Sequence, residues 1–267
     1  MSGVTEAHQL LVTPSRKVFA PMPSACAMEV FRSEPIGLPP TPRVRPVATH
    51  EISVATLRGF PMFADTPEES LKVVARACML RRVARNAHVV RAGERTDFVY
   101  LILAGSLDVL VSDEEGREAI LSILGPGELF GEMGVLDDEA RSATVMATTP
   151  STLVVIAKSD FNRCLRENFD VTRYVMRKLV QRLRMADRRI ESLALLDVAG
   201  RVVRLLRDMA ETLGGERVVM RKLCRHDIAK MVGASREMVS RVLKDLELRG
   251  FIEENDGRIV VHELGSQ

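Results

Sequence analysis

The stretch FDVTRYVMRKLVQRLRMADRRIESLALL, residues 169–196, organises the rest of the chain. It contains neither Gly nor Pro, and its apolar residues recur at alternating spacings of three and four. These residues are Met176, Leu179, Leu183, Ala186, Ile190 and Leu193. A seam of this kind is typical of two long helices that pair. A single core helix with a solvated face is the alternative, but a stretch of about four heptads is longer than most globular helices. We therefore expect a helix that pairs two copies of the chain.

Composition limits the classes of protein that this chain can be. Its 267 residues allow one large or two ordinary domains, and its net charge of +2 means that any basic surface must be local. The cysteines at positions 26, 78, 164 and 224 form no C-x-x-C pair, which fits a reducing cytosol. No apolar run reaches the length of a membrane span, and no secretory signal is evident. The five histidines show no metal-ligand spacing. We expect a cytoplasmic protein without a metal and without a membrane partner.

The N-terminal part of the chain differs in texture from the rest. Eight of the twelve prolines fall within residues 1–55, and hydrophobic periodicity there is poor. We expect a disordered extension. The tetrapeptide at 66–69, Thr-Pro-Glu-Glu, then predicts the start of a helix, with Thr66 as the N-cap and Pro67 in the first helical position.

Residues 80–160 consist of short apolar runs separated by glycines. The runs are residues 98–103, 107–111, 119–124 and 153–156, and residues 113–116 suit a hairpin turn. Regular short strands with glycine turns favour a closed β-roll or barrel. A metalloenzyme of the cupin type is the alternative. It requires a cluster of histidines and carboxylates, and His88 is the only histidine in this region.

The most informative β segment is FGEMGVLDDEARSAT, residues 130–144. Its two glycines allow a tight backbone whose N–H groups can point at an anion. Arg141 and Ser142 offer a planar cation and a hydroxyl, which together suit a phosphate diester. Glu132 would repel phosphate, but it can accept a hydrogen bond from a ribose hydroxyl. A turn with an incidental Arg–Glu bridge is the alternative.

The segment after the long helix predicts a hinge. Asp197 can N-cap a new amphipathic helix, which we expect to continue to about Leu213 and to end at Gly214-Gly215. The junction between Leu196 and Asp197 is therefore the expected point of flexure.

A second strong motif, CRHDIAKMVGASREMVSRVLKDLELRG, occupies residues 224–250. The motif has the residue spacing of a helix-turn-helix. Ala229 is the small residue of the first helix, Gly233 makes the turn, and the apolar residues of the second helix are Val239 and Val242. Nine cations and four acids between residues 217 and 249 give a local charge of 9 − 4 = +5. Such a basic segment indicates a DNA-binding surface.

The second helix of this motif carries side chains suited to reading bases. Ser235 can cap the helix, and Arg236, Glu237 and Arg241 then project from its first two turns. Arg suits guanine and Glu can accept from cytosine. An i, i+4 bridge between Glu237 and Arg241 on a solvated face is the alternative, and the two roles are compatible. Residues 251–262 predict a hairpin that forms a wing.

From about residue 60 to its end, the chain resembles the cyclic AMP receptor protein/FNR (Crp/Fnr) family of bacterial transcription regulators. Three segments match the family's sequences closely: L-A-L-L-D-V at 193–198, V-G-A-S-R-E-M-V at 232–239 and I-V-V at 259–261. The resemblance implies an α+β fold. Its expected parts are a cyclic-nucleotide-binding β-roll (jelly roll) at 56–165, a dimerisation helix at 166–196 and a winged helix-turn-helix domain at 197–267.

The family also assigns roles to residues. It implies ligand contacts for Gly131, Glu132, Met133, Arg141, Ser142, Ala186 and Asp187. It implies DNA contacts for Arg225, His226 and Ser235 near phosphates and for Arg236, Glu237 and Arg241 at bases. The implied partners are palindromic double-stranded DNA, a second copy of the chain and RNA polymerase, and no enzymatic activity is implied.

One departure from the family concerns the base of the ligand. A Thr-Ser pair on the dimer helix touches adenine in the cyclic AMP receptor, and Ala186 and Asp187 occupy those positions here. Cyclic AMP is the expected effector, and cyclic di-GMP or the absence of any ligand are alternatives within the same class. The other classes are a nucleoid-type DNA binder and a cyclic-nucleotide-regulated enzyme, although no kinase or hydrolase constellation accompanies the cassette.

Overall fold

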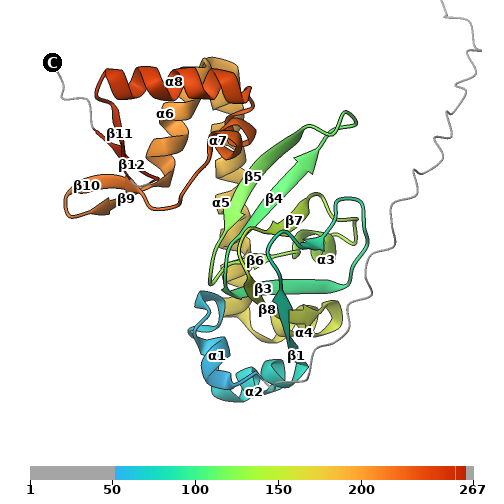
Figure 1. Cartoon of the computed structure of the whole chain (residues 1–267). Coiled ribbons are helices and arrows are strands. Elements are labelled where there is room, and N and C mark those ends of the chain that lie inside the picture. The colour runs from blue at the N-terminus through green and yellow to red at the C-terminus, as the bar shows by residue number, and fades with distance from the viewer. Residues whose placement is uncertain (1–51, 256, 263–267) are drawn as a thin grey trace, which may run out of the picture. The chain divides into compact units, whose positions relative to one another are not determined.

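The computed structural model describes residues 52–255 and 257–262 (Figure 1). The expected N-terminal extension therefore lies almost entirely outside the described residues. Its last positions do not belong to an extension, because Ile52 is buried in the first hydrophobic core and Ser53 caps the first helix. The amide of Thr56 donates to the Ser53 hydroxyl at 3.1 Å.

Three short helices precede the first strand. They are α1 (Val54–Arg58), the 3₁₀ helix η1 (Pro61–Phe63) and α2 (Glu68–Ala77). The expected N-cap of α2 is wrong by one residue, since Pro67 occupies the cap and makes no side-chain hydrogen bond. The Thr66 hydroxyl is instead buried, without a hydrogen-bond partner among the described residues. Packing of the Thr66 side chain into the core overrides its capping preference.

Two four-stranded antiparallel sheets follow, as the glycine-separated runs predict. The first has the order β1 (Cys78–Val83), β8 (Ser151–Ala157), β3 (Phe98–Ala104), β6 (Leu129–Phe130). The second has the order β2 (His88–Val90), β7 (Thr144–Ala147), β4 (Leu107–Ser112), β5 (Glu118–Leu124). Residues of both sheets, among them Ile102, Leu107 and Leu153, are fully buried in one apolar cluster. The burial of alternate residues from both sheets in one core confirms the predicted β-roll.

Glycines fix two of the close approaches in this roll. Gly105 has φ +101°, and a Cβ there would lie 2.1 Å from the Ser151 hydroxyl oxygen. Gly116 has φ +77° in the β4–β5 hairpin, where the amide of Asp113 donates to the carbonyl of Arg117 at 3.0 Å. The hairpin turn predicted at 113–116 is therefore confirmed.

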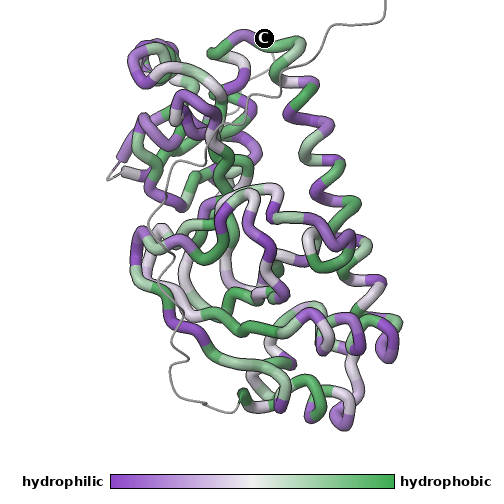
Figure 2. Tube along the Cα trace, turned by 90° about the vertical axis from the view of Figure 1, so that its right-hand side faces the viewer, coloured by the Kyte–Doolittle hydropathy of each residue, from purple (hydrophilic) through white to green (hydrophobic). Residues whose placement is uncertain are grey.

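The helices α3 (Met133–Leu136), α4 (Lys158–Glu167) and α5 (Phe169–Leu195) complete this half of the chain. The long helix predicted from residue 169 is confirmed, although residues 166 and 167 belong to α4. Val171 and Val175 of α5 are buried against the first core. Figure 2 shows hydrophobic and hydrophilic residues alternating along the whole length of α5.

The break between helices expected at residues 196 and 197 is present, while its role as a hinge stays a prediction. The amide of Leu196 caps α5, and α6 (Val198–Met209) starts at Asp197, whose carboxylate accepts from the Gly200 amide at 2.8 Å. The expectation that this helix continues to about Leu213 is wrong. Ala210–Leu213 forms β9, which pairs with β10 (Glu216–Val219) through Gly214 and Gly215. Pairing with the sheet overrides helical amphipathicity at these four residues.

The helix-turn-helix motif and the wing form as the sequence predicts. Helices α7 (Arg225–Val232) and α8 (Arg236–Leu248) are joined at Gly233, which has φ +66°. Strands β11 (Ile252–Asn255) and β12 (Arg258–Val261) pair as the predicted hairpin, and residue 256 lies outside the described residues. The third sheet has the order β11-β12-β10-β9, and α6, α7 and α8 share one apolar core with it.

Among the described residues, no helix combines the length and the apolar character that crossing a membrane requires.

Candidate ligand and nucleic-acid sites

Residues 130–144, the cassette of the β-roll, are shaped by two glycines. Gly131 has φ +83°, and a Cβ there would lie 2.9 Å from Nη1 of Arg141 and 3.2 Å from the Phe98 carbonyl oxygen. A Cβ at Gly134 would lie 2.8 Å from the Glu139 carbonyl oxygen. The backbone therefore closes tightly around the Arg141 side chain, and no larger residue fits at either position.

Arg141 is buried inside this cassette, with 6% of its surface exposed. Its guanidinium donates to the carbonyls of Gly131, Thr96 and Phe98, and Nε donates to the Thr96 hydroxyl at 2.8 Å. Burial lowers the pKa of Arg141. The predicted phosphate-binding cation is thus held in place by groups of the chain itself. Sequence reasoning missed Thr96, because it lies 45 residues away from Arg141.

Glu132 is buried beside Arg141, with 1% of its surface exposed. One carboxylate oxygen, Oε1, accepts from Arg182 on α5, and Arg182 also donates to the Leu129 carbonyl. The other oxygen, Oε2, is buried and has no hydrogen-bond partner among the described residues. Burial raises the pKa of Glu132, while the positive charge of Arg182 acts in the opposite direction. The site therefore contains one acceptor that lacks a donor.

The other expected ligand side chains are exposed, unlike this buried pair. Met133 is 46% exposed and Ser142 is exposed, each next to a buried cassette residue in sequence. Ala186 and Asp187 are exposed on α5. Within the described chain, no hydrogen bond or ion pair links Asp187 to the cassette. The connection between α5 and the cassette is made by Arg182, which no local sequence signal identified because Glu132 is 50 residues away.

The apolar seam of α5 is largely uncovered within one chain. Leu183, Ile190 and Leu193 are 63%, 65% and 60% exposed. Leu179 departs from the predicted seam, because it packs against the chain's own first core. Exposed leucines and isoleucines in a row of this length indicate a surface that another protein surface covers.

The expected base-reading residues are exposed on α8. Ser235 caps the helix by accepting from the Met238 amide at 3.2 Å, as predicted. Arg236, Glu237 and Arg241 are exposed, and hydrogen bonds from the backbone and from Ser235 hold the pKa of Glu237 below its usual value. In the described part of the chain, no ion pair joins Glu237 to Arg241. The bridge that was the alternative interpretation of these two residues is therefore not formed in the described structure.

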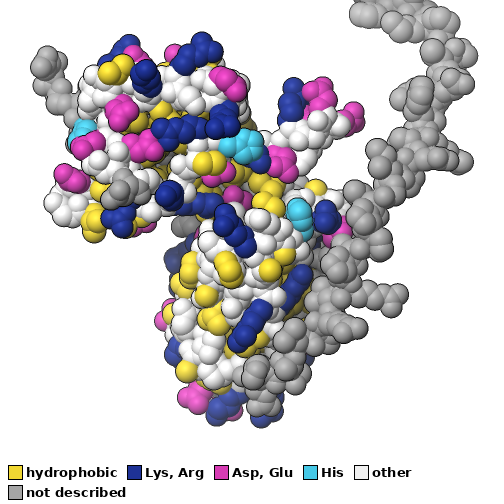
Figure 3. Space-filling view, in the orientation of Figure 1, with side chains coloured by type: hydrophobic (Ala, Val, Ile, Leu, Met, Phe, Trp, Pro, Cys, Tyr) yellow, Lys and Arg dark blue, Asp and Glu magenta, His cyan; other side chains and the backbone are white. Residues whose placement is uncertain are grey.

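Several cations that the sequence counted toward a DNA-binding surface are paired within the chain. Both terminal nitrogens of Arg225 bond Glu254 of β11, at 2.8 and 2.7 Å, whereas the neighbouring His226 is exposed. The further pairs are Arg221–Asp108, Lys230–Glu118 and Arg249–Asp245. Figure 3 shows acidic side chains mixed with Lys and Arg over the C-terminal domain. The local charge of +5 thus overstates the free positive charge available to DNA.

Two protein-family models match two separate segments of the chain. Residues 80–168 match a cyclic nucleotide-binding domain, and residues 200–265 match a Crp-like helix-turn-helix domain. The first range contains the cassette, and the second contains α7, α8 and the wing.

Individual proteins are similar over most of their length. The cAMP-activated global transcriptional regulator CRP of Pasteurella multocida is 34% identical over 189 residues, which are 69% of this chain and 90% of that protein. The regulator Vfr of Pseudomonas aeruginosa, also described as cAMP-activated, is 33% identical, with 69% and 89% covered. The structure of CLP from Xanthomonas campestris, described as a c-di-GMP responsive global regulator, is 25% identical. It has a TM-score of 0.63, with 74% of this chain and 100% of that chain covered.

Proposed function

Because the chain belongs to the Crp/Fnr family and is a ligand-controlled DNA-binding regulator, we propose that its effector is cyclic AMP bound in the cassette of residues 130–144. The proposal extends to the roles of individual residues. Gly131, Glu132, Met133, Arg141 and Ser142 contact the cyclic phosphate and ribose, while Ala186 and Asp187 face the base.

The observation that carries this proposal is the unpaired Oε2 of Glu132. A buried acceptor without a donor is costly, by about 1–3 kcal/mol, and a ribose hydroxyl is a donor of the right kind. Arg141 lies beside it and can exchange one of its carbonyl partners for a phosphate oxygen. That exchange gains a charge-assisted bond, about twice as strong as a neutral one. A molecule that combines a ribose with one phosphate satisfies both groups together.

Arg182 supports a route from the ligand to the DNA-binding domain. It connects Glu132 to α5, and α5 leads directly to the capped junction at Asp197. A ligand hydroxyl that bonds Oε2 shares the carboxylate that holds Arg182. Binding can therefore bias the position of α5, and with it the domain that follows the hinge.

We also propose that two chains pair through α5. The exposed seam supports this, since its leucines and isoleucine gain free energy only when a partner covers them. Leu183→Glu places like charges opposite one another in such a pair, so sedimentation should show monomers. A variant that sediments as a dimer would contradict pairing through α5.

For DNA, we propose that α8 enters the major groove, with Arg236, Glu237 and Arg241 at base edges and with Arg225, His226 and Ser235 close to phosphates. The exposure of Arg236, Glu237 and Arg241 on the first two turns of the capped helix α8 supports the base-reading role. A two-fold dimer then requires half-sites about 10 base pairs apart, centre to centre. A contact with RNA polymerase stays a prediction of the family resemblance.

Titration calorimetry with cyclic AMP, cyclic GMP and cyclic di-GMP tests the ligand proposal. We expect cyclic AMP to bind the wild type, and Glu132→Gln to weaken binding at least about tenfold, or 1.4 kcal/mol. Glu139→Gln is the matched control, because it removes the same charge from an exposed position in the same cassette. Equal affinity of the wild type and Glu132→Gln would mean that the ribose hydroxyl is bound elsewhere.

Cyclic di-GMP is a second candidate effector, and one observation favours it. Asp187 takes part in no ion pair among the described residues, so its carboxylate is available to accept from N1–H and N2–H of guanine. Arg184 and Arg188 are exposed close by on α5 and offer cations for a second phosphate. Tighter binding of cyclic di-GMP than of cyclic AMP in the same titration would favour this candidate.

A further inference from the structure

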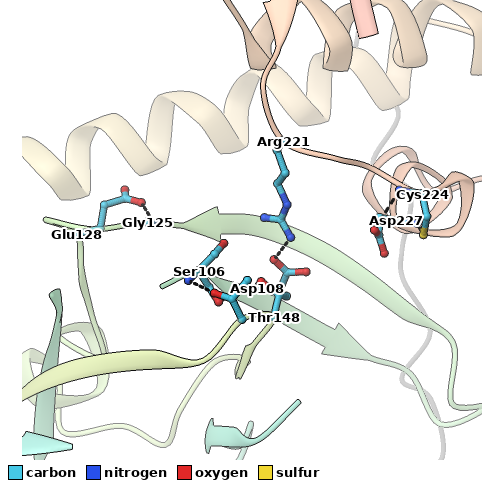
Figure 4. A network of polar contacts seen from close by, with 9 residues as sticks. Ser106, Asp108, Gly125, Glu128, Thr148, Arg221, Cys224 and Asp227 are labelled. Carbon is cyan, nitrogen blue, oxygen red and sulfur yellow. Dashed lines mark hydrogen bonds and ion pairs between the residues drawn. The ribbon is translucent and has the colours of Figure 1, made fainter. Parts of the chain in front are cut away.

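Two ion pairs join the β-roll to the DNA-binding domain. Nη2 of Arg221, in the segment between β10 and α7, lies 2.9 Å from Oδ1 of Asp108 on β4. Nζ of Lys230 on α7 lies 2.6 Å from Oε2 of Glu118, the first residue of β5. Figure 4 shows the Arg221 side chain extended from the C-terminal domain onto Asp108. Each pair spans more than a hundred residues of sequence, since the separations are 113 and 112.

Asp108 is unusual for a carboxylate on a β-strand because its side chain is only 6% exposed. Burial raises its pKa, and Arg221 is the one described residue that hydrogen-bonds the carboxylate. A buried charge without a partner is strongly unfavourable. The β-roll therefore contains a buried acid whose counterion is supplied by the DNA-binding domain.

The contact is strong but not fully satisfied. Nη1 of Arg221 is buried in this arrangement and has no hydrogen-bond partner among the described residues. A buried donor without an acceptor reduces the stability of the docked arrangement. Release of the domain returns this donor to water, so the contact is suited to open and close rather than to remain permanently closed.

The two cations also belong to the surface that the DNA backbone would approach. Helix α7 is the first helix of the helix-turn-helix, and this helix crosses the DNA backbone in complexes of this class. Arg221 lies in the segment that leads into α7, and Lys230 lies on α7 itself. While carboxylates of the β-roll hold them, neither cation is available to a phosphate.

Asp108 is also close in the sheet to the ligand cassette. Strand β4 pairs with β7, where Asp108 is opposite Met146 and Leu110 is opposite Thr144. Thr144 begins β7 two residues after Ser142 of the cassette. A shift of the cassette on ligand binding therefore reaches Asp108 through one pair of hydrogen-bonded strands.

We propose that Asp108 and Glu118 form an acidic latch that restrains the DNA-binding domain in the ligand-free protein by holding Arg221 and Lys230. The latch competes with DNA for the same two cations, and its opening frees the domain to engage both half-sites. The inference goes beyond the proposed effector and does not depend on its identity, because its test uses protein without ligand.

The test measures the affinity of ligand-free protein for a duplex that the wild type selects from a random library. Asp108→Asn, Glu118→Gln and the double variant should bind this duplex more tightly, by about fivefold or more for the double variant. Asp113→Asn is the matched control, since it removes the same charge from the β4–β5 hairpin, but its partner Arg117 lies in that hairpin. Unchanged or weaker binding by a folded double variant would overturn the latch.

A second measurement separates release of the latch from simple loss of negative charge near DNA. Acylation of lysines by an N-hydroxysuccinimide ester, read by mass spectrometry without DNA, reports the accessibility of Lys230, with exposed Lys222 as the internal reference. Asp108→Asn should raise the reactivity of Lys230, although that substitution leaves Glu118 intact. If DNA binding tightens while Lys230 stays protected, the latch is wrong. If Asp108→Asn does not fold, Glu118→Gln carries the DNA-binding test, because that side chain is 38% exposed.

Discussion

The cassette and helix α8 hold their charged side chains in opposite ways. In the cassette, Arg141 and Glu132 are 6% and 1% exposed, and the chain itself occupies most of their hydrogen-bonding groups. On α8, Arg236 and Arg241 are exposed and form no ion pair in the described part of the chain. The cassette is thus built into the fold of the β-roll, whereas the surface of α8 is added to a helix that folds without it.

This difference predicts different consequences of mutation. Changes in the cassette affect stability and ligand binding together, because each side chain also satisfies buried groups of the protein. Changes on α8 affect DNA recognition alone, because exposed substitutions rarely alter the free energy of unfolding by more than about 0.5 kcal/mol.

The largest effect is expected from Arg141→Leu. The substitution removes the cation proposed for the phosphate and leaves the carbonyls of Thr96 and Phe98 without their donor. Calorimetry should show no binding of any cyclic nucleotide, and denaturant unfolding should show lower stability with the dimer retained. Arg95→Leu, an exposed arginine nearby in sequence, should change neither property. Unchanged nucleotide affinity in Arg141→Leu would exclude the cassette as the binding site.

A smaller effect, confined to DNA, is expected from the exposed arginines of α8. Arg236→Ala or Arg241→Ala should each cost about 1–3 kcal/mol at the preferred site and relax base preference at one position. Unfolding curves should not move. Lys222→Ala is the comparison, because we expect exposed Lys222, which precedes α7, to contact phosphate, and loss of a phosphate contact weakens all sequences evenly. Identical profiles for Arg236→Ala and Lys222→Ala across a site library would refute base reading by Arg236.

The base of the ligand gives the next effect in size. Asp187→Ser combined with Ala186→Thr supplies hydroxyls that both donate to and accept from adenine. The ratio of cyclic AMP affinity to guanine-nucleotide affinity should rise about tenfold, or 1.4 kcal/mol. Both residues are exposed on α5, so stability should not change. A constant ratio would mean that other residues select the base.

The smallest expected effect is on the pH dependence of the free energy of unfolding. Burial raises the pKa of Glu132 in the folded protein above its ordinary value of 4.5, so the folded state retains this proton longer than the unfolded state. Stability therefore falls as pH rises from about 4.5 toward the folded-state pKa. Glu132→Gln should remove this contribution, so its unfolding free energy should decline less with pH over that range. Parallel pH profiles for the two proteins would contradict a raised pKa.

Local sequence signals were enough to predict much of both regions. Four confirmed features each depend on residues a few positions apart. They are the Ser235 cap, the turn at Gly233, the Asp197 cap and the 113–116 hairpin. The same is true of the long helix, whose period is visible in its own sequence.

The features that sequence missed depend on tertiary contacts. Thr66 lost its capping role to the core, and residues 210–213 paired with β10 instead of extending α6. Thr96, Arg182 and Asp108 find their partners 45, 50 and 113 residues away. The charge count of residues 217–249 failed for the same reason, because the acids that neutralise Arg221, Arg225 and Lys230 lie outside that range.

The most direct test of control by the cassette is DNA affinity with and without nucleotide, at fixed salt. Wild-type protein and Arg141→Leu are titrated with the selected palindrome and with a scrambled duplex, in buffer alone and with saturating cyclic AMP, or with cyclic di-GMP if calorimetry shows that to be the ligand. For the wild type, nucleotide should change affinity for the palindrome by about fivefold or more, and by a larger factor than it changes affinity for the scrambled duplex. Arg141→Leu should show no change with either duplex. The same response in both proteins, or no response in the wild type, would contradict control through the cassette.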